Sequence, residues 1–449
     1  MSAARLIGGL AVVLIAASVG SPSGTSMSTE HLTAFVGGRV LPAPEENPIP
    51  DGVVLVEGAT IRSVGPRAAV QIPADAQVID CSGATVTAGF WNSHVHIRPA
   101  VFPAAETAPS EVLGSALRAM LTSHGVVHAV DLGSNLSNTL ALRRRIESGD
   151  ILGPTILMAG SGFAPAGGSP FYILPAKLPE LAQPADAGLV ENALARGADL
   201  VKLYTGSWAT PGSIVVMPVD VVRAAVDVGH RHGKLVFAHP SNSPGARAAI
   251  EGGVDILAHT FPTSLDDSPW DRTLLVMMKA RGMALIPTLK VWPYEMKRAG
   301  RPADRIDRIL ATGIAQTRAF AELGGQLLFG TDVGYMTDFD PSEEFVYLQR
   351  AGLGTAQILS MLTTAPAARF GQARRGRLGP GFAADVVVLD GDPESDVRVF
   401  GRARTTMRDG AIIYSTALPR AWYADSPVEW AYSPGRSGIV NVNVEPVPS

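Results

Sequence analysis

Two histidines separated by one residue, His94 and His96, end an apolar run that the sequence predicts to be a β-strand. Successive side chains of a strand point to opposite faces, so both imidazoles lie on one face and Val95 lies on the other. Two imidazoles at this spacing can chelate one divalent cation. The pair alone is a weak motif, because short histidine pairs also occur at structural positions. A metal site here needs further ligands from other parts of the chain.

Later apolar runs end in four more side chains that could bind a metal. If the runs are the strands of one parallel barrel, their carboxyl ends meet at one rim, where barrel enzymes place their active sites. Imidazole and carboxylate ligands suit Zn²⁺, with Mn²⁺, Co²⁺ or Fe²⁺ as alternatives. With the first pair, the candidate metal ligands are His94, His96, Lys202, His239, His259 and Asp332.

The elements that would position these residues repeat regularly between residues 86 and 371. Eight short apolar runs are found, at residues 86–92, 126–131, 154–159, 200–204, 235–239, 255–259, 284–288 and 326–331. Amphipathic stretches lie between them, at residues 111–123, 138–148, 219–232, 271–281 and 304–323. This alternation predicts parallel βαβ units. Eight strands, with no G-x-G-x-x-G or G-x-x-x-x-G-K-[ST] after any of them, favour an α/β fold of the (β/α)8 TIM-barrel type over an open doubly wound sheet.

The segments that flank the predicted barrel in the sequence differ from it in their pattern of apolar and turn-forming residues. Residues 27–85 and 372–415 contain short strand-like pieces separated by Gly, Pro and Asp. Chain ends often lie close together, so we expect the two segments to form one small composite β-sandwich domain. Residues 416–449 form a C-terminal extension to which the sequence assigns no role.

The first 26 residues resemble a secretory signal peptide. Arg5 precedes an apolar run at residues 6–19, and small and turn-forming residues follow. This pattern predicts a secreted or periplasmic protein with no stable membrane insertion after cleavage. An uncleaved anchor is the alternative, although the run is shorter than the ~20 residues of a membrane span.

Composition narrows the class of partner. The chain has 449 residues, 46% hydrophobic and 17% charged, with a net charge of −4, as is usual for a globular protein. Lys and Arg are scattered, so we expect no nucleic-acid partner. The one cysteine, Cys81, excludes an intrachain disulfide framework. We expect a small-molecule or short-peptide substrate, and the composition is compatible with a homo-oligomer.

The order H-x-H, Lys, His, His, Asp at successive strand ends resembles the amidohydrolase superfamily, in its binuclear-metal subtype related to imidazolonepropionase-like and prolidase-like (Xaa-Pro dipeptidase-like) enzymes. The segment A-G-F-W-N-S-H-V-H at residues 88–96 resembles the family's P-G-[FL]-[IW]-D-x-H-x-H, and G-P-G-F-A-A-D at residues 379–385 resembles its returning sheet segment. Ala88 and Asn92 depart from the pattern, but neither is at a ligand position.

The resemblance implies two divalent metal ions bridged by a carbamate that CO2 forms on Lys202. A lysine buried in a low-dielectric barrel has a lowered pKa and can react as the neutral amine. The alternative is a lysine in a structural ion pair. The resemblance divides the other ligands between the ions, with His94, His96 and Asp332 at one and His239 and His259 at the other.

A hydroxide that bridges two cations is nucleophilic near neutral pH, because the metals lower the pKa of bound water. Asp332 is the expected general base, which later hands the proton to the leaving nitrogen. Tyr204 follows Lys202 by two residues, so it should face the same side and could donate a hydrogen bond to the oxyanion. A packed structural tyrosine is the alternative for Tyr204.

These features predict hydrolysis of a C–N bond, an amide or peptide bond in a dipeptide or N-acyl amino acid. A lactonase or other ester hydrolase is the alternative within the same site, since the same nucleophile attacks any activated carbonyl. A non-catalytic binding protein that keeps the barrel is the alternative of another class, which the loss of a ligand would favour. No expected ligand is missing from the sequence.

Other polar residues are predicted to have structural roles. Asp131 ends the second strand and could hydrogen-bond the site.

The loops at residues 162–177, 205–217 and 261–270 are expected to shape the pocket. Nearby aromatic residues are Phe163, Tyr172, Trp208 and Trp292. No metal role is proposed for the remaining histidines, His31, His124, His128, His230 and His232.

Overall fold

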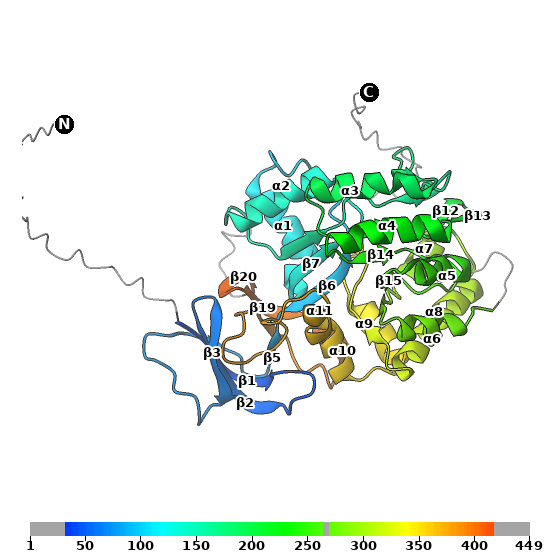
Figure 1. Cartoon of the computed structure of the whole chain (residues 1–449). Helices are drawn as coiled ribbons and strands as arrows, with labels where there is room; N and C mark the ends of the chain where they lie inside the picture. Colours follow the sequence, from blue (N-terminus) through cyan, green and yellow to red (C-terminus); the bar gives the residue numbers. More distant parts are fainter. Residues whose placement is uncertain (1–31, 264–268, 417–449) are drawn as a thin grey trace, which may run out of the picture.

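The computed structural model describes residues 32–263 and 269–416. Two regions are visible in Figure 1: a parallel-strand region (residues 90–371) surrounded by helices, and a sheet region (residues 32–88 and 372–416) beside it. No helix of these described residues is long and apolar enough to cross a membrane. The predicted signal peptide, and the C-terminal extension after residue 416, lie outside the described residues.

The parallel-strand region contains one strand for each of the eight predicted apolar runs. These strands are β6 (Phe90–Val95), β7 (Val126–Asp131), β8 (Thr155–Met158), β11 (Val201–Leu203), β14 (Val236–Ala238), β15 (Ile256–Ala258), β16 (Ala284–Ile286) and β17 (Gln326–Leu327). They form two sheets, of order β6-β7-β8 and β11-β14-β15-β16-β17, and every neighbouring pair is parallel. The predicted α/β class with parallel strands is confirmed.

Backbone hydrogen bonds connect the edges of these two sheets. At one edge, Ser93 N donates to Phe329 O at 2.8 Å. At the other, Phe163 N donates to Lys202 O at 2.9 Å, and Tyr204 N donates to Phe163 O at the same distance. These are the two edges that a closed barrel would join.

Helices follow most of the strands and pack on the outside of the parallel-strand region (Figure 1). They are α1 (Ser110–Met120), α2 (Leu136–Glu147), α3 (Gly188–Ala195), α4 (Val219–Arg231), α5 (Ser243–Gly252), α6 (Thr273–Ala280), α7 (Val291–Arg298), α8 (Ala303–Glu322), α9 (Ser342–Arg350), α10 (Thr355–Leu362) and α11 (Thr364–Arg369). Helix α4 shows why they form. Its apolar face, with Val222 and Val226, is buried, and the left-handed Gly233 follows its end. Five of the helices, α1, α2, α4, α6 and α8, match the predicted amphipathic stretches.

Shorter elements line the connections. They are the 3₁₀ helices η1 (Thr122–His124), η2 (Phe171–Ile173), η3 (Pro184–Ala187) and η4 (Val397–Gly401), and the strands β9 (Ala164–Pro165), β10 (Glu180–Leu181), β12 (Gly206–Thr210) and β13 (Ser213–Val216). Strands β12 and β13 form a hairpin between β11 and α4.

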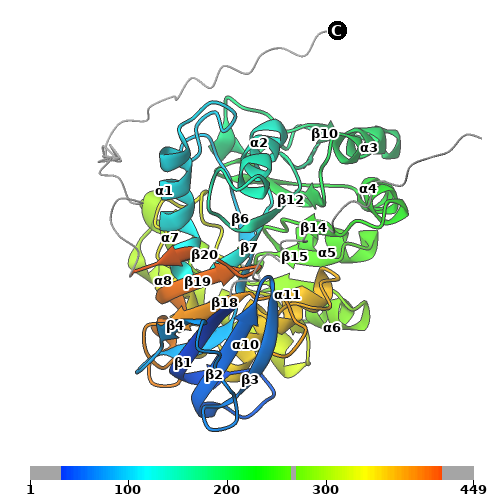
Figure 2. The same ribbon diagram turned by 90° about the vertical axis from the view of Figure 1, so that its left-hand side faces the viewer.

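The sheet region combines segments from the two ends of the described chain (Figure 2). Its strands are β1 (Leu32–Leu41), β2 (Ile49–Glu57), β3 (Thr60–Pro66), β4 (Gln77–Asp80), β5 (Thr85–Ala88), β18 (Val386–Leu389), β19 (Ala403–Arg408) and β20 (Ala411–Ser415). We expected a small composite β-sandwich domain, and the strands of the two segments are joined in one mixed sheet of order β20-β19-β18-β5-β1-β2-β3, with β4 also paired to β1. The reason is that β5 pairs with both β1 and β18, which makes one continuous ladder.

A short junction joins the two regions. The predicted strand run at residues 86–92 is divided between β5 and β6, and Gly89 lies between them. A Cβ atom at Gly89 would lie 2.4 Å from the Val127 side chain, so only glycine allows this close packing. Across the same junction His128 Nε2 lies 2.9 Å from Asp385 Oδ2, and Arg375 donates to that oxygen at 2.5 Å.

Candidate metal centre and active site

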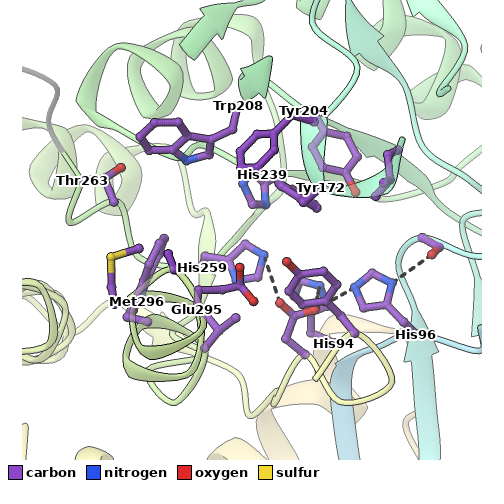
Figure 3. Close-up of a pocket in the computed structure, with 18 of the residues that line it drawn as sticks. His94, His96, Tyr172, Tyr204, Trp208, His239, His259, Thr263, Glu295 and Met296 are labelled. Carbon is purple, nitrogen blue, oxygen red and sulfur yellow. Dashed lines mark hydrogen bonds and ion pairs between the residues drawn. The ribbon is translucent and has the colours of Figure 1, made fainter. Parts of the chain in front are cut away.

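The six predicted metal ligands and Tyr204 all line one cavity of about 360 Å³. The cavity lies at the carboxyl ends of the parallel strands, and Figure 3 shows the histidine rings directed toward its centre. The side chains of His94, His96, Lys202, His259 and Asp332 are buried, and that of His239 is half-buried. Residues that are far apart in the sequence therefore meet as the strand-end argument predicts.

The first group of ligands is compact. The donor atoms of His94, His96 and Asp332 all lie within 4.8 Å of one another. His96 Nδ1 is 3.0 Å from Gly133 O, which can only accept, so Nδ1 carries a proton and the other nitrogen, Nε2, faces the site. That Nε2 lies 2.7 Å from Asp332 Oδ1. Without a metal this contact is an ion pair with the proton on Nε2, and a divalent ion bound by both atoms would replace that proton, so the donor set fits a metal ion.

The second group lies beside the first. The rings of His239 and His259 are 4.7 Å apart, and His259 Nε2 lies 4.0 Å from Asp332 Oδ2. Thr288 Oγ1 donates to Pro287 O, so it accepts from His259 Nδ1, at 2.5 Å, and leaves Nε2 free. Ser241 Oγ donates to Gly206 O, so it accepts from His239 Nε2, at 3.1 Å, and leaves Nδ1 free. Each imidazole therefore has one nitrogen available to a metal.

Burial favours the neutral form of these basic groups. It lowers the pKa values of His94, His239 and His259 well below their usual range, and nearby positive charge lowers them further. Burial also lowers the pKa of Lys202 to about 7, although the Asp332 carboxylate opposes this effect. Neutral imidazole is the form that binds metal, and neutral lysine is the form that reacts with CO2.

The backbone at the strand ends is strained. Four non-glycine residues have positive φ values at this rim: Ser241 (53°), His259 (84°), Thr288 (44°) and Asp332 (62°). Left-handed conformations cost free energy in such residues and persist only where the surrounding structure fixes them. In the described chain, the other non-glycine residue of this kind is Asp409, in the β19–β20 turn. The strain is therefore concentrated where the ligands must be oriented.

Asp131, which we expected to hydrogen-bond the site, acts through the loop that follows it. It is buried and accepts from Ser134 Oγ at 2.5 Å and Thr139 Oγ1 at 2.9 Å. This holds the loop whose Gly133 carbonyl orients His96. A Cβ atom at Gly133 would lie 2.9 Å from His96 Cε1, so the loop needs glycine there.

The cavity walls come partly from residues that the sequence pattern singled out. Tyr172, Trp208 and Trp292 line the cavity, whereas Phe163 is buried away from its lining. Tyr204 lines it as well, and burial raises its pKa to about 12, so its phenol stays protonated. Of the loop at residues 261–270, residues 264–268 lie outside the described chain.

Several lining residues were not predicted, among them Arg98, Glu295 and Tyr335. Arg98 follows His96 by two residues, and strand alternation could have indicated it. Glu295 lies on α7, one helical turn after Trp292, but that helix was not predicted. Tyr335 follows Asp332 in a loop with no periodic signal.

The other histidines have structural partners. His230 Nε2 lies 2.9 Å from Asp255, His232 Nε2 lies 2.5 Å from Glu191, and His124 Nδ1 lies 2.7 Å from Gly401 O. None of these three, nor His128, lines the cavity. His31 lies outside the described residues.

Comparison with known sequences gives one family match and several distant relatives. The sequence model of the Amidohydrolase family matches residues 85–413. An uncharacterized protein of Mycobacterium tuberculosis is 29% identical over 212 residues, 44% of this chain and 53% of its own length. Ochratoxinase of Aspergillus niger is 24% identical over 217 residues, 46% of this chain and 43% of its own. The matched part of the chain thus spans about half the length of these curated relatives.

Solved structures resemble the chain over most of its length. The crystal structure of a Xaa-Pro dipeptidase with bound methionine has a TM-score of 0.72 at 21% identity, covering 86% of this chain and 100% of that one. The structure of A. niger ochratoxinase has a TM-score of 0.71 at 19% identity, covering 88% and 98%. At these identities the likeness is one of fold.

Proposed function

The chain belongs to the amidohydrolase family, and from this premise we propose that it is a metal-dependent hydrolase that cleaves a C–N bond. One observation carries the proposal: six metal-binding side chains from five strand ends face one cavity at the carboxyl ends of the parallel strands. The family match confirms the resemblance to the amidohydrolases that the H-x-H pattern indicated.

We propose that the site holds two divalent ions, Zn²⁺ or one of its alternatives. His94, His96 and Asp332 would hold one ion and His239 and His259 the other, with carboxylated Lys202 between them. The close approach of His96 to Asp332 and the free nitrogen on each oriented ring support this assignment. Bound ions would polarise the substrate carbonyl and lower the pKa of water at the site.

The chain's own residues would then manage protons and charge. Asp332 reaches both histidine groups, at 2.7 Å from His96 and 4.0 Å from His259, so its carboxylate is placed to take a proton and return it to the leaving nitrogen. The protonated phenol of Tyr204 is placed in the same cavity to donate a hydrogen bond to the carbonyl oxygen as negative charge develops.

We also propose that the two parallel sheets close into a (β/α)8 barrel. The hydrogen bonds of Ser93 with Phe329 and of Phe163 with Lys202 and Tyr204 lie at the two edges that closure requires. A closed barrel explains why ligands from β6 and from the strands of the other sheet reach one rim.

For the substrate we propose a dipeptide or an N-acyl amino acid. A cavity of about 360 Å³ suits a molecule of this size. The structural neighbours include a Xaa-Pro dipeptidase, an enzyme named for a dipeptide substrate. Amides need a proton on the leaving nitrogen, and Asp332 can supply it, whereas an ester leaves without that help.

The test is an assay of the metal-loaded protein on dipeptides, N-acyl amino acids and lactones. We expect metal-dependent amide hydrolysis, and we expect Asp332→Asn to slow it more than any lactone opening, in protein shown to retain both metals. Fast lactone opening without amide cleavage would favour the ester hydrolase instead. Ligand binding without turnover of any substrate would favour the non-catalytic alternative.

A further inference from the structure

A second carboxylate faces the metal cavity. Glu295 lies on α7, whose residues Trp292, Glu295 and Met296 line the cavity, as does Ala299 just after the helix, at the helical spacing of one face. Figure 3 shows the Glu295 side chain beside His259, directed toward the site. Among the lining residues, Asp332 and Glu295 are the ones with carboxylate groups.

The Glu295 carboxylate is incompletely satisfied within the protein. Its side chain is 23% exposed. Arg298, one turn along the same helix, approaches both carboxylate oxygens, but each contact is 3.4 Å long, at the limit of a hydrogen bond. The same guanidinium is shared with the Tyr335 hydroxyl, at 3.3 Å. The Tyr335 hydroxyl also hydrogen-bonds Glu295. An ionised carboxylate can accept about four hydrogen bonds, and Glu295 Oε1 is buried with no hydrogen-bond partner among the described residues, so Glu295 keeps acceptor capacity.

Glu295 does not belong to the compact ligand group, which contains His94, His96 and Asp332. Its surroundings instead suit an organic cation. The aromatic rings of Tyr172, Trp208 and Trp292 line the same cavity, and such rings attract ammonium groups through their faces. Arg98 and Arg301 also line the cavity, so the Glu295 carboxylate and the aromatic rings are the lining groups that could attract an ammonium group of the substrate.

We propose that Glu295 binds the free α-amino group of the substrate, so that the preferred substrates are dipeptides and not N-acyl amino acids. This inference rests on the proposed function and selects between the two substrate classes given there. The α-ammonium group of a dipeptide is separated from the scissile carbonyl by one carbon, which matches a carboxylate close to the metal ligands. An N-acyl substrate would cover the carboxylate with apolar atoms and offer it no donor, which is unfavourable in a cavity largely shielded from water.

The experiment compares each active dipeptide with its desamino analogue, in which hydrogen replaces the ammonium group. In the wild-type protein kcat/KM should favour the dipeptide by roughly 10- to 100-fold, as expected for one hydrogen bond to a charged group. Glu295→Gln should reduce this ratio to near one, mainly by raising KM for the dipeptide. Glu295→Asp, which keeps the charge, should retain part of the preference.

Glu322→Gln is the matched control, because it removes the same charge from an exposed position at the end of α8. It should leave the ratio unchanged, and metal content should be equal in all variants. The inference is overturned if the wild-type protein prefers the desamino analogues, or if Glu295→Gln keeps the wild-type ratio. If neither class is hydrolysed, the proposed function itself fails, whereas hydrolysis of N-acyl substrates alone overturns only the role of Glu295.

Discussion

Two buried clusters of histidine and carboxylate, one at the junction with the sheet region and one at the carboxyl ends of the parallel strands, differ in how their charges are paired. At the junction with the sheet region, Asp385 accepts from His128, Arg375 and the backbone of Asp409, and together these partners lower its pKa to about 2 against the effect of burial. At the cavity, Asp332 lies 2.7 Å from His96 and 4.0 Å from His259 with no arginine partner, and strained backbone holds the ligands.

The difference shows that burial of ionisable groups does not by itself indicate a function. In the junction cluster the Asp385 carboxylate is paired with Arg375 and His128, so its role is to connect two regions. The cavity cluster leaves lone pairs directed at one point, which costs free energy unless a cation occupies that point. We therefore expect substitutions in the junction cluster to change stability alone and substitutions in the cavity cluster to change activity alone.

Removal of Lys202 should have the largest effect on activity. Lys202→Ala deletes the proposed bridge between the metals, so we expect amide hydrolysis to fall on the order of 10³-fold or more, as several kcal/mol of metal-derived stabilisation is lost. Small carboxylates such as formate or acetate should restore part of the rate by occupying the vacated space. Full activity of the variant, measured by kcat/KM with added metal, would exclude the bridging role.

Breaking the junction cluster should change stability instead. Asp385→Asn leaves Arg375 without its buried partner, so we expect the free energy of unfolding to fall by about 3 to 5 kcal/mol. Activity per folded, metal-loaded molecule should stay near that of the wild type. Urea denaturation and kcat measure the two quantities, and an active-site defect without a loss of stability would contradict the division of roles.

The lowered pKa of Asp385 predicts that the protein becomes less stable in acid. The pKa of Asp385 is about 2 in the folded protein and 3.8 in its unperturbed state. Because the folded value is the lower one, the stabilisation is fully present above pH 4 and is lost as the pH falls toward 2. It amounts to about 2 kcal/mol. The difference in unfolding free energy between the wild type and Asp385→Asn should therefore shrink by about 2 kcal/mol over this range, and parallel curves would be inconsistent with this role.

A smaller effect is expected from the residue that orients His259. Thr288→Val keeps the shape of the side chain but removes the hydroxyl that accepts from His259 Nδ1, so metal affinity should fall about 10-fold. Thr288→Ser keeps the hydroxyl and should bind metal as the wild type does. Competition with a chelator measures both. Equal losses in the two variants would mean that packing, and not the hydrogen bond, orients the ring.

The sequence predicted the parts of the molecule that depend on local periodicity. The strand at residues 256–258 and its terminal His259 follow from an apolar run that ends in a polar residue, and the same logic located Lys202 and Asp332. It could not predict the positive φ values of His259 and Thr288, because tertiary contacts impose them. The single sheet also depends on long-range pairing of β5 with β18, which no local pattern specifies.

Glu295 shows a second limit of what the sequence can predict. Helix α7 contains Pro293 and has no side-chain hydrogen bond at its N-cap, so it has a weak start signal, and without the helix the residue cannot be placed on a face. The sequence places Trp292 near the pocket as an aromatic residue. It does not indicate Glu295, because the two residues lie on one face only if the segment is a helix. Residues that line a cavity from a connecting helix therefore need the structure to be found.

The most direct test of the account is the metal content of the purified protein. Elemental analysis should find close to two divalent ions per chain in the wild type after loading with Zn²⁺. His259→Asn should hold about one ion and lose most of its activity, because an ion with too few ligands dissociates. A folded wild-type protein that binds no divalent ion under these conditions would contradict the central claim that the strand ends form a metal centre.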